Sequence, residues 1–351
     1  MKEKVILVIN EGYSDNLGDK AIQRSALSFF NKNDIQVQYS DFTRVNNTEI
    51  SSNVKESKMG KTKYFRFLLK IIPPKIRWTV LNLKRLLKDA KEKYSLVSIG
   101  GGQLILSNET FSIALYLWVN ILHYYKNKNI ILLCVGVADK FTYFNKFLFL
   151  RSLNKINKIY VRDEQSLINL KKIFNIDGEI TYDIAFYEKH CSTSYIPQYH
   201  LLGVTELSVY NNYNIPVSKN EYYHSWINLL NKNNISLNKD VKLFYTTHGD
   251  LCECIEFKKF CMTAFNIDLE ILNTNDLDKL NVSLLKARTV ISGRMHALIL
   301  AYNLKIKVIS YPISQKLIAF DREIISSKAN LQVIRERLTN TKNEILQAYD
   351  L

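Results

Sequence analysis

The alternation of strand and helix is clearest between residues 130 and 174, which have the sequence IILLCVGVADKFTYFNKFLFLRSLNKINKIYVRDEQSLINLKKIF. Residues 130–137 form a continuous apolar run, which is typical of a strand buried on both faces of a sheet. A helical pattern follows over 144–157, then a short strand over 159–161 and a helix over 164–174. Because parallel strands need crossover connections, this order predicts a parallel sheet covered by helices on both faces.

The same alternation extends in both directions along the chain. Strands are predicted over residues 5–9, 35–42, 96–99 and 179–184, and, beyond a polar stretch at 188–198, over 201–205, 241–246, 269–271, 289–292 and 307–310. A chain of 351 residues is long enough for two domains. We therefore expect the α/β class, with two Rossmann-like, doubly wound domains over 1–190 and 198–351. They would face a cleft in which ligands bind at the carboxyl ends of the strands.

The composition indicates a globular protein with an anionic partner. Lysine and arginine number 48 against 33 acidic residues, a formal net charge of +15, and 47% of the residues are apolar. That apolar content excludes wholesale disorder, and the charge points to a phosphorylated ligand, a lipid surface or nucleic acid. Five cysteines predict no disulfide framework, and neither a signal peptide nor a membrane-spanning run is recognisable. We expect a cytoplasmic location.

Two thirds of the excess charge is concentrated in residues 55–93. This basic segment holds 13 basic and three acidic residues, interleaved with aromatic and aliphatic ones, and Pro73-Pro74 divides it into two arms. One interpretation is an inserted helical pair with a solvated basic face. Another is an amphipathic patch that binds an anionic membrane surface. Nucleic acid would attract the same charge, but no nucleic-acid-binding motif accompanies it, so no nucleic-acid partner is expected.

The first motif is Asn16-Leu17-Gly18-Asp19, between the strand at 5–9 and a helix predicted over 20–30. Asp19 stands where a helix N-cap is expected, and capping alone would explain its carboxylate. The functional interpretation places Asn16 and Asp19 at the carboxyl edge of the sheet. There they could bind an acceptor sugar, and Asp19 could deprotonate a hydroxyl.

The second motif is Gly100-Gly101-Gly102-Gln103, directly after the strand at 96–99. Three glycines at a strand end indicate a bare backbone ledge, so Gly101, Gly102 and Gln103 are candidates for binding a ligand. A tight turn below the helix predicted over 110–125 is the alternative. The spacing is not the dinucleotide-binding fingerprint.

The third motif is Val161-Arg162-Asp163-Glu164-Gln165-Ser166, at another change from strand to helix. An arginine at this edge can bind a carboxylate or a phosphate through two hydrogen bonds, so Arg162 is a candidate for binding an anion. The alternative is a local surface pair between Arg162 and Asp163.

The fourth motif is the most informative: Ser292-Gly293-Arg294-Met295-His296-Ala297, between the strand at 289–292 and a helix over 295–302. A helix N-terminus favours an anion, and Arg294 adds a guanidinium there. His296 can hold or donate a proton near neutral pH. Ser292, Arg294 and His296 are therefore predicted to bind an anion, with Arg294 and His296 also catalytic.

Two patterns suggest metal binding only weakly. His248, Cys252, Cys254 and Cys261 lack a paired Cys-x-x-Cys, and Cys252 and Cys254 diverge on a helix. Asp276-Leu277-Asp278 opens a helical stretch, where carboxylates are expected on electrostatic grounds. No metal site is predicted.

Together and in this order, the four motifs resemble the polysaccharide pyruvyl transferase family. Its strand-end Asp-x-Ala-Phe corresponds to Asp183-Ile184-Ala185-Phe186, although the family usually has proline at the second position. After the last strand this chain has Tyr311-Pro312 where the family often has Tyr-Asp.

The resemblance implies a glycosyltransferase B-like architecture and a pyruvyl group transferred from phosphoenolpyruvate to a sugar as a cyclic ketal, with release of phosphate. It implies Arg162, Arg294 and His296 in the donor site, and no metal or other cofactor. We further expect His296 either as the acid or as the group that neutralises the leaving phosphate, two roles that stay open, and Asp19 as a base for the acceptor hydroxyl. Ser292 would belong to the donor site with these residues. The acceptor would be bound by Asn16, Asp19, Gly101, Gly102 and Gln103. The acceptor domain would span 1–190 and the donor domain 198–351. The acceptor would be a lipid-linked repeat of a capsule or exopolysaccharide, with the basic segment at the inner face of the membrane.

Two other functions remain open at this point. One is a glycosyltransferase of the same architecture that uses a nucleotide sugar. The other is a non-enzymatic, membrane-associated anion-binding protein.

Overall fold

The computed structural model describes residues 4–32, 34–43, 72–108, 110–188 and 196–351. The first part of the basic segment, 55–71, lies outside the described residues. The chain forms two compact units. Unit 1 comprises Met1–Tyr13, Ala26–Ile184 and Thr339–Leu351, and unit 2 comprises Ser14–Ser25 and Ala185–Leu338. Helix α1 (Leu17–Phe30) contributes to both units.

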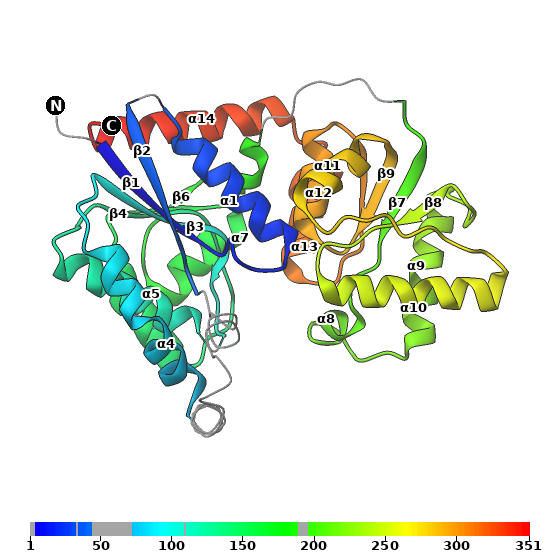
Figure 1. Cartoon of the computed structure of the whole chain (residues 1–351), viewed down its shortest axis with the longest axis horizontal. Helices are drawn as coiled ribbons and strands as arrows, with labels where there is room; N and C mark the ends of the chain where they lie inside the picture. Colours follow the sequence, from blue (N-terminus) through cyan, green and yellow to red (C-terminus); the bar gives the residue numbers. More distant parts are fainter. Residues whose placement is uncertain (1–3, 33, 44–71, 109, 189–195) are drawn as a thin grey trace, which may run out of the picture. The chain divides into compact units, whose positions relative to one another are not determined.

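Unit 1 contains a six-stranded parallel sheet in the order β2-β1-β3-β4-β5-β6 (Figure 1). The strands are β1 (Lys4–Asn10), β2 (Ile35–Asp41), β3 (Leu96–Ile105), β4 (Ile130–Val137), β5 (Lys158–Val161) and β6 (Glu179–Ile180). The connecting helices are α4 (Pro74–Ala90), α5 (Phe111–Tyr124), α6 (Tyr143–Leu153) and α7 (Glu164–Asn169). The strand order reverses between β1 and β3. Since crossovers are right-handed, α1 lies on the opposite face of the sheet from α5.

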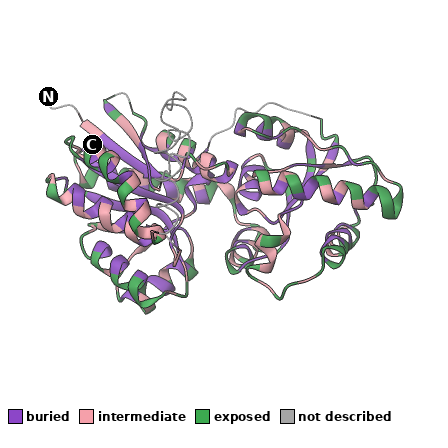
Figure 2. Cartoon of the chain, turned by 60° about the horizontal axis from the view of Figure 1, so that its bottom comes forward, coloured by how far each residue is buried: buried purple, intermediate pink, exposed green. Residues whose placement is uncertain are grey.

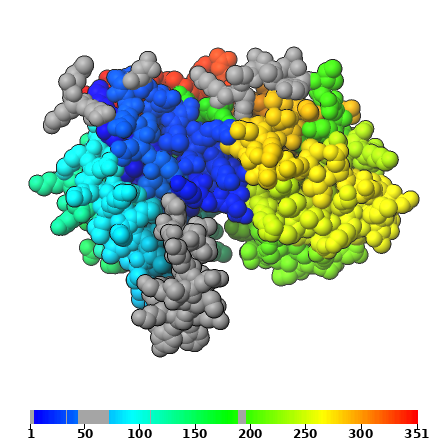
Figure 3. Space-filling view, in the orientation of Figure 1, coloured from blue at the N-terminus to red at the C-terminus, as the bar shows by residue number. Residues whose placement is uncertain are grey.

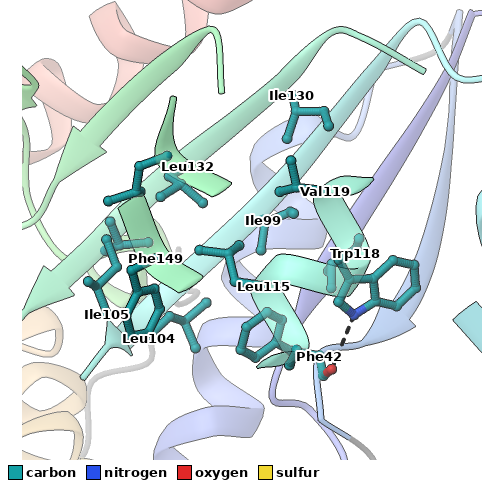
Figure 4. Packing of buried hydrophobic residues seen from close by; sticks show 14 of the residues in the cluster. Phe42, Ile99, Leu104, Ile105, Leu115, Trp118, Val119, Ile130, Leu132 and Phe149 are labelled. Atoms are coloured by element: carbon teal, nitrogen blue, oxygen red, sulfur yellow. Dashed lines mark hydrogen bonds between the residues drawn. The ribbon is translucent and has the colours of Figure 1, made fainter. Parts of the chain in front are cut away.

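The core of unit 1 explains why the apolar runs predict strands so well. Every residue of β4 is buried, and α4, α5 and α6 cover one face of the sheet with apolar side chains (Figure 4). Trp118 of α5 is fully buried, and its indole N–H donates to the carbonyl of Phe42 at 3.1 Å. This hydrogen bond satisfies the polar atom that the tryptophan brings into the core.

Unit 2 contains a four-stranded parallel sheet in the order β10-β9-β7-β8. The strands are β7 (Tyr199–Gly203), β8 (Val241–Leu243), β9 (Ala287–Ser292) and β10 (Lys307–Ser310). The helices are α8 (Leu207–Asn211), α9 (Lys219–Lys232), α10 (His248–Phe265), α11 (Leu277–Leu285), α12 (Met295–Asn303) and α13 (Gln315–Phe320). Helix α14 (Leu331–Ala348) begins in unit 2 and belongs to unit 1 from Thr339 onward. Burial follows the strands in both units (Figure 2). Here the order reverses between β7 and β9, where ligands bind in sheets of this kind.

Three predicted boundaries differ from the structure. The glycine run does not end a strand, because β3 continues through it to Ile105. The predicted strand over 269–271 is reduced to one bridge between Ile271 and Leu243. Only Glu179–Ile180 of the predicted 179–184 strand forms a strand, and Ile184–Tyr187 is a 3-10 helix. None of the described helices combines the length and apolarity needed to span a bilayer.

Candidate active site

A small cavity of about 110 Å³ lies at the carboxyl edge of the unit 2 sheet. Segments that follow all four strands contribute to its wall, as does the start of α1. The lining residues are Asn16, Gly18, Val209, Tyr213, Thr246, Gly293, Arg294, Met295, His296, Ala297, Ile313, Ser314 and Lys316. A cavity at the switch point of a parallel sheet is the expected place for a ligand.

The turn between β9 and α12 presents Arg294 to this cavity. The Ser292 hydroxyl accepts the Arg294 backbone N–H at 3.0 Å and donates to the carbonyl of Gly203 at 3.4 Å. Gly293 packs so closely that a Cβ there would lie 2.6 Å from the Thr205 hydroxyl oxygen. Ser292 is fully buried and does not line the cavity, so its role in the structure is to shape the turn.

Arg294 is held by Asp250, a residue that the sequence analysis did not single out. Its Nε lies 3.0 and 3.2 Å from the two carboxylate oxygens, and its Nη2 lies 2.7 Å from Oδ1. The Asp250 side chain is 3% exposed and also accepts hydrogen bonds from the Glu206 N–H and the Thr246 hydroxyl. The carboxylate therefore fixes the plane of the guanidinium, which remains 23% exposed.

His296 packs against the first turn of α1. A Cβ on Gly18 would lie 2.6 Å from Nδ1 of His296, so only glycine allows this approach. The Leu17 N–H donates to the carbonyl of Thr246 at 2.9 Å, and Arg24 forms an ion pair with Asp278 at 2.8 Å. These contacts hold the start of α1 within unit 2, where the dark blue segment meets the yellow and orange ones in Figure 3.

Asp19 is not the N-cap that the sequence suggested. Helix α1 begins at Leu17, and the Asn16 side chain accepts the Gly18 N–H at 3.0 Å, so Asn16 takes the capping position. Burial raises the pKa of the Asp19 carboxyl above its ordinary value. The charges of His296 and Lys316 and hydrogen bonds from Ser14 and Asn16 oppose that shift. Asp19 does not itself line the cavity, but it belongs to the same charged cluster as His296 and Lys316.

Lys316 is a charged cavity residue that the sequence analysis did not propose as a site residue. It follows β10 and lies at the start of α13, which places its charge on the wall shared with His296 and Arg294. The cavity is therefore lined by two permanent cations and an imidazole, as an anionic ligand requires.

Arg162 lies in unit 1 and is 4% exposed, with its guanidinium between two carboxylates. Its Nε is 3.2 Å from Asp163 and its Nη1 is 3.3 Å from Asp183. The expected surface pair with Asp163 alone is thus wrong, because the pair is buried and includes a second aspartate. A Cβ on Gly136 would lie 2.9 Å from the guanidinium carbon, so this glycine makes room for the arginine.

Gly101 and Gly102 also lie in unit 1, inside β3 and not at its end. Both have φ near 79°, a conformation that favours glycine, and the pairing with β4 shifts after Gly102. A Cβ on Gly100 would lie 2.1 Å from the carbonyl oxygen of Leu133. The run is therefore required by the irregular pairing with β4, and Gln103 beside it is half-buried.

Most of the chain also matches a known protein family in sequence. The sequence model for polysaccharide pyruvyl transferase matches residues 16–315. The chain belongs to the polysaccharide pyruvyl transferase family. Membership identifies it as a transferase of polysaccharide biosynthesis. No curated protein gives a significant match to the sequence.

Solved structures confirm the fold class of this transferase. UDP-GlcNAc 2-epimerase from Methanocaldococcus jannaschii is 13% identical, with a TM-score of 0.50 over 95% of this chain and 91% of that chain. HepE from Anabaena, solved with UDP and glucose, is 10% identical, with a TM-score of 0.50 over 98% and 99%. At this identity the likeness concerns the fold alone, which is glycosyltransferase B-like with two Rossmann-like units.

The weak metal patterns do not converge in the transferase. Within the described ranges, no group of three His, Cys, Asp or Glu side chains is arranged to hold a metal ion. Asp276 instead caps α11, where its side chain accepts the Lys279 N–H at 2.8 Å. Asp250 could have been found from sequence, because Thr247 and Asp250 form a helix-start pattern directly after a predicted strand.

Proposed function

We propose that this transferase uses phosphoenolpyruvate as its donor and binds it in the unit 2 cavity. The observation that carries the proposal is the convergence of Arg294, His296 and Lys316 on one small cavity at the start of α12. Phosphoenolpyruvate has a carboxylate and a phosphate on three carbons, and two cations beside a helix N-terminus match that charge. Arg162 is committed to its carboxylates in unit 1, so its part in donor binding stays a prediction.

The residue types support a stepwise transfer with balanced protons. His296 donates a proton to the methylene carbon of the donor, which makes C2 electrophilic. A sugar hydroxyl attacks C2 and returns its proton to His296. The bond between C2 and the phosphate oxygen then breaks. A second hydroxyl closes the ketal, and its proton leaves with the phosphate. Arg294 and Lys316 stabilise the negative charge of the departing phosphate.

Asp19 acts in this proposal as the partner of His296. Its raised pKa allows a carboxyl group at this position to exchange a proton under milder conditions than a solvated aspartate. Because Asp19 does not line the cavity, we assign it to the pair with His296 and not to direct contact with the acceptor.

The finer features of the acceptor also belong to the proposal. We propose a lipid-linked repeat unit of a capsule or exopolysaccharide, bound by a peripheral enzyme at the inner face of the membrane. The basic segment 55–93 supports this location, because anionic lipids attract clustered lysines and arginines. Asn16, Gly101, Gly102 and Gln103 stay predicted acceptor-binding residues.

Phosphate release from phosphoenolpyruvate across a panel of lipid-linked and aryl glycosides tests the proposal. His296→Ala should lower turnover by about 10²-fold or more while the thermal unfolding midpoint is preserved. The matched control is His224→Ala, on α9 and outside the cavity lining. Release of a nucleotide from a nucleotide sugar, without phosphate release from phosphoenolpyruvate, would instead identify a glycosyltransferase.

A further inference from the structure

The apolar side chains of α4 form one broad face, and only part of that face is buried. The buried part packs into the core of unit 1 through Trp78, Leu86 and Ala90. In the exposed part, four apolar side chains are between 37% and 58% exposed: Ile76, Val80, Leu83 and Leu87. Their spacing of four, three and four residues places them within an arc of about 60° on the helix surface. The exposed part of this face is wider than the core contact of α4 requires, and an exposed apolar stripe of this kind indicates a binding partner.

Exposed aromatic residues of α6 lie next to the start of α4. Tyr143, Phe144 and Phe147 are 96%, 55% and 50% exposed. The ammonium of Lys75, the residue before Ile76, lies 5.6 Å from the centroid of the Phe144 ring. We name the exposed part of the apolar face of α4 together with these three aromatic residues the α4–α6 surface.

The charges that directly flank the apolar stripe of α4 are those of lysines. Lys84, Lys88 and Lys91 are exposed and flank the apolar stripe on one side. The acidic Asp89 faces inward, where it accepts a hydrogen bond from the Ser40 hydroxyl at 2.6 Å. Lysine is depleted in protein–protein interfaces, because its ammonium is costly to dehydrate there. Beside a lipid phosphate layer the same lysines keep their charge at the headgroups, while their stems extend the apolar contact.

We infer that the α4–α6 surface binds an anionic lipid bilayer, with α4 lying in the plane of the interface. Ile76, Val80, Leu83 and Leu87 would enter the boundary between headgroups and acyl chains. Aromatic side chains at this depth anchor interfacial helices, and the flanking lysines would contact lipid phosphates. This inference deepens the proposed membrane location, and it stands independently of the donor chemistry.

Co-sedimentation of the full-length protein with vesicles tests the inference, using phosphatidylcholine with and without phosphatidylserine. Val80→Asp/Leu83→Asp should lower the partition coefficient on anionic vesicles by about tenfold or more. The matched control is Val282→Asp/Val333→Asp, which adds the same two charges at apolar positions that are 49% and 53% exposed elsewhere. Lys84→Gln/Lys88→Gln should weaken binding at low salt and much less at high salt.

Several results would overturn the inference. One is the absence of binding between the wild-type protein and anionic vesicles. Another is a Val80→Asp/Leu83→Asp variant that binds these vesicles as well as the wild type does. A concentration-dependent dimer that Val80→Asp/Leu83→Asp dissolves, without vesicle binding, would show that a second copy covers the surface. Phosphate release with a short soluble acceptor should be unchanged in all these variants. Loss of vesicle binding with that activity intact separates this inference from the proposed function.

Discussion

Replacing Asp250 by asparagine tests whether a buried carboxylate orients Arg294 in the proposed donor site. Asp250 accepts Nε and Nη2 of Arg294 at 2.7–3.2 Å and is 3% exposed. Asparagine preserves the volume and one acceptor oxygen, but it places an amide N–H₂ against the guanidinium. The change therefore removes the charge pair and half of the two-oxygen contact without opening a cavity.

The magnitude follows from burial on the two sides of the pair. Breaking a fully buried pair costs about 3–5 kcal/mol. Because Arg294 is 23% exposed, water compensates part of that loss, and we expect about 2–3 kcal/mol. For a unit of this size the unfolding midpoint should fall by roughly 4–10 °C. An unoriented Arg294 should raise the donor KM by about tenfold, equivalent to about 1.4 kcal/mol, with a smaller change in kcat.

Thermal unfolding and donor-dependent phosphate release measure both effects. Asp276→Asn is the control, since it makes the same change at the exposed N-cap of α11, where asparagine caps equally well. Asp250→Asn with an unchanged donor KM would refute the orienting role, even if the midpoint fell. An unchanged midpoint as well would refute the pair as a stabilising contact.

Three further predictions concern other contacts. Gly18→Ala places a Cβ 2.6 Å from Nδ1 of His296 and should lower kcat by about tenfold or more, measured against a midpoint that falls by only a few degrees. A Gly18→Ala variant that keeps the wild-type kcat would contradict this prediction. Asp19 has a raised pKa, so between pH 3.8 and that raised value the folded state holds a proton that the unfolded state has lost, and stability falls as pH rises. Asp19→Asn should abolish that decline in a pH series of unfolding midpoints and should remove the acidic limb of kcat/KM, whereas superimposable profiles would argue against the shift. Trp118→Phe should cost about 2–3 kcal/mol in denaturant unfolding, because the Phe42 carbonyl loses its donor and a cavity opens; a loss below about 0.5 kcal/mol would show that water replaces the indole.

The strands of the fold were predictable because burial on both faces leaves a continuous apolar run. The strand predicted over 130–137 has the bounds of β4, and each of its residues is buried. The glycine run predicted a strand end because glycine usually ends a strand. In β3 the chain continues through Gly101 and Gly102 with φ near 79°, and Gly100 before them packs directly against the Leu133 carbonyl of the neighbouring strand. A contact between strands leaves no local signal.

The candidate site was predictable where the motif itself sets the geometry. Arg294 and His296 follow a strand and begin a helix, so the rule for parallel sheets places them at the carboxyl edge. Asp250 and Lys316 could not be paired with them from sequence, because they follow different strands and only the strand order brings them together. The assignment of Asp19 as an N-cap failed by three residues, because the helix begins at Leu17.

The two arginines of the family motifs differ in the charge that surrounds them. Arg162 is buried between Asp163 and Asp183 in unit 1. Arg294 pairs with Asp250, and Lys316 and His296 line the same cavity beside the Asp19 carboxyl, whose pKa is raised by burial. When Asp19 is protonated, Arg294 and Lys316 exceed the charge of Asp250 by one. A buried guanidinium that two carboxylates already neutralise attracts an anion weakly, whereas one that shares a cavity with a lysine attracts it strongly. The same residue type at two equivalent strand ends therefore forms a buried cluster with two carboxylates in unit 1 and is suited to bind an anion in unit 2.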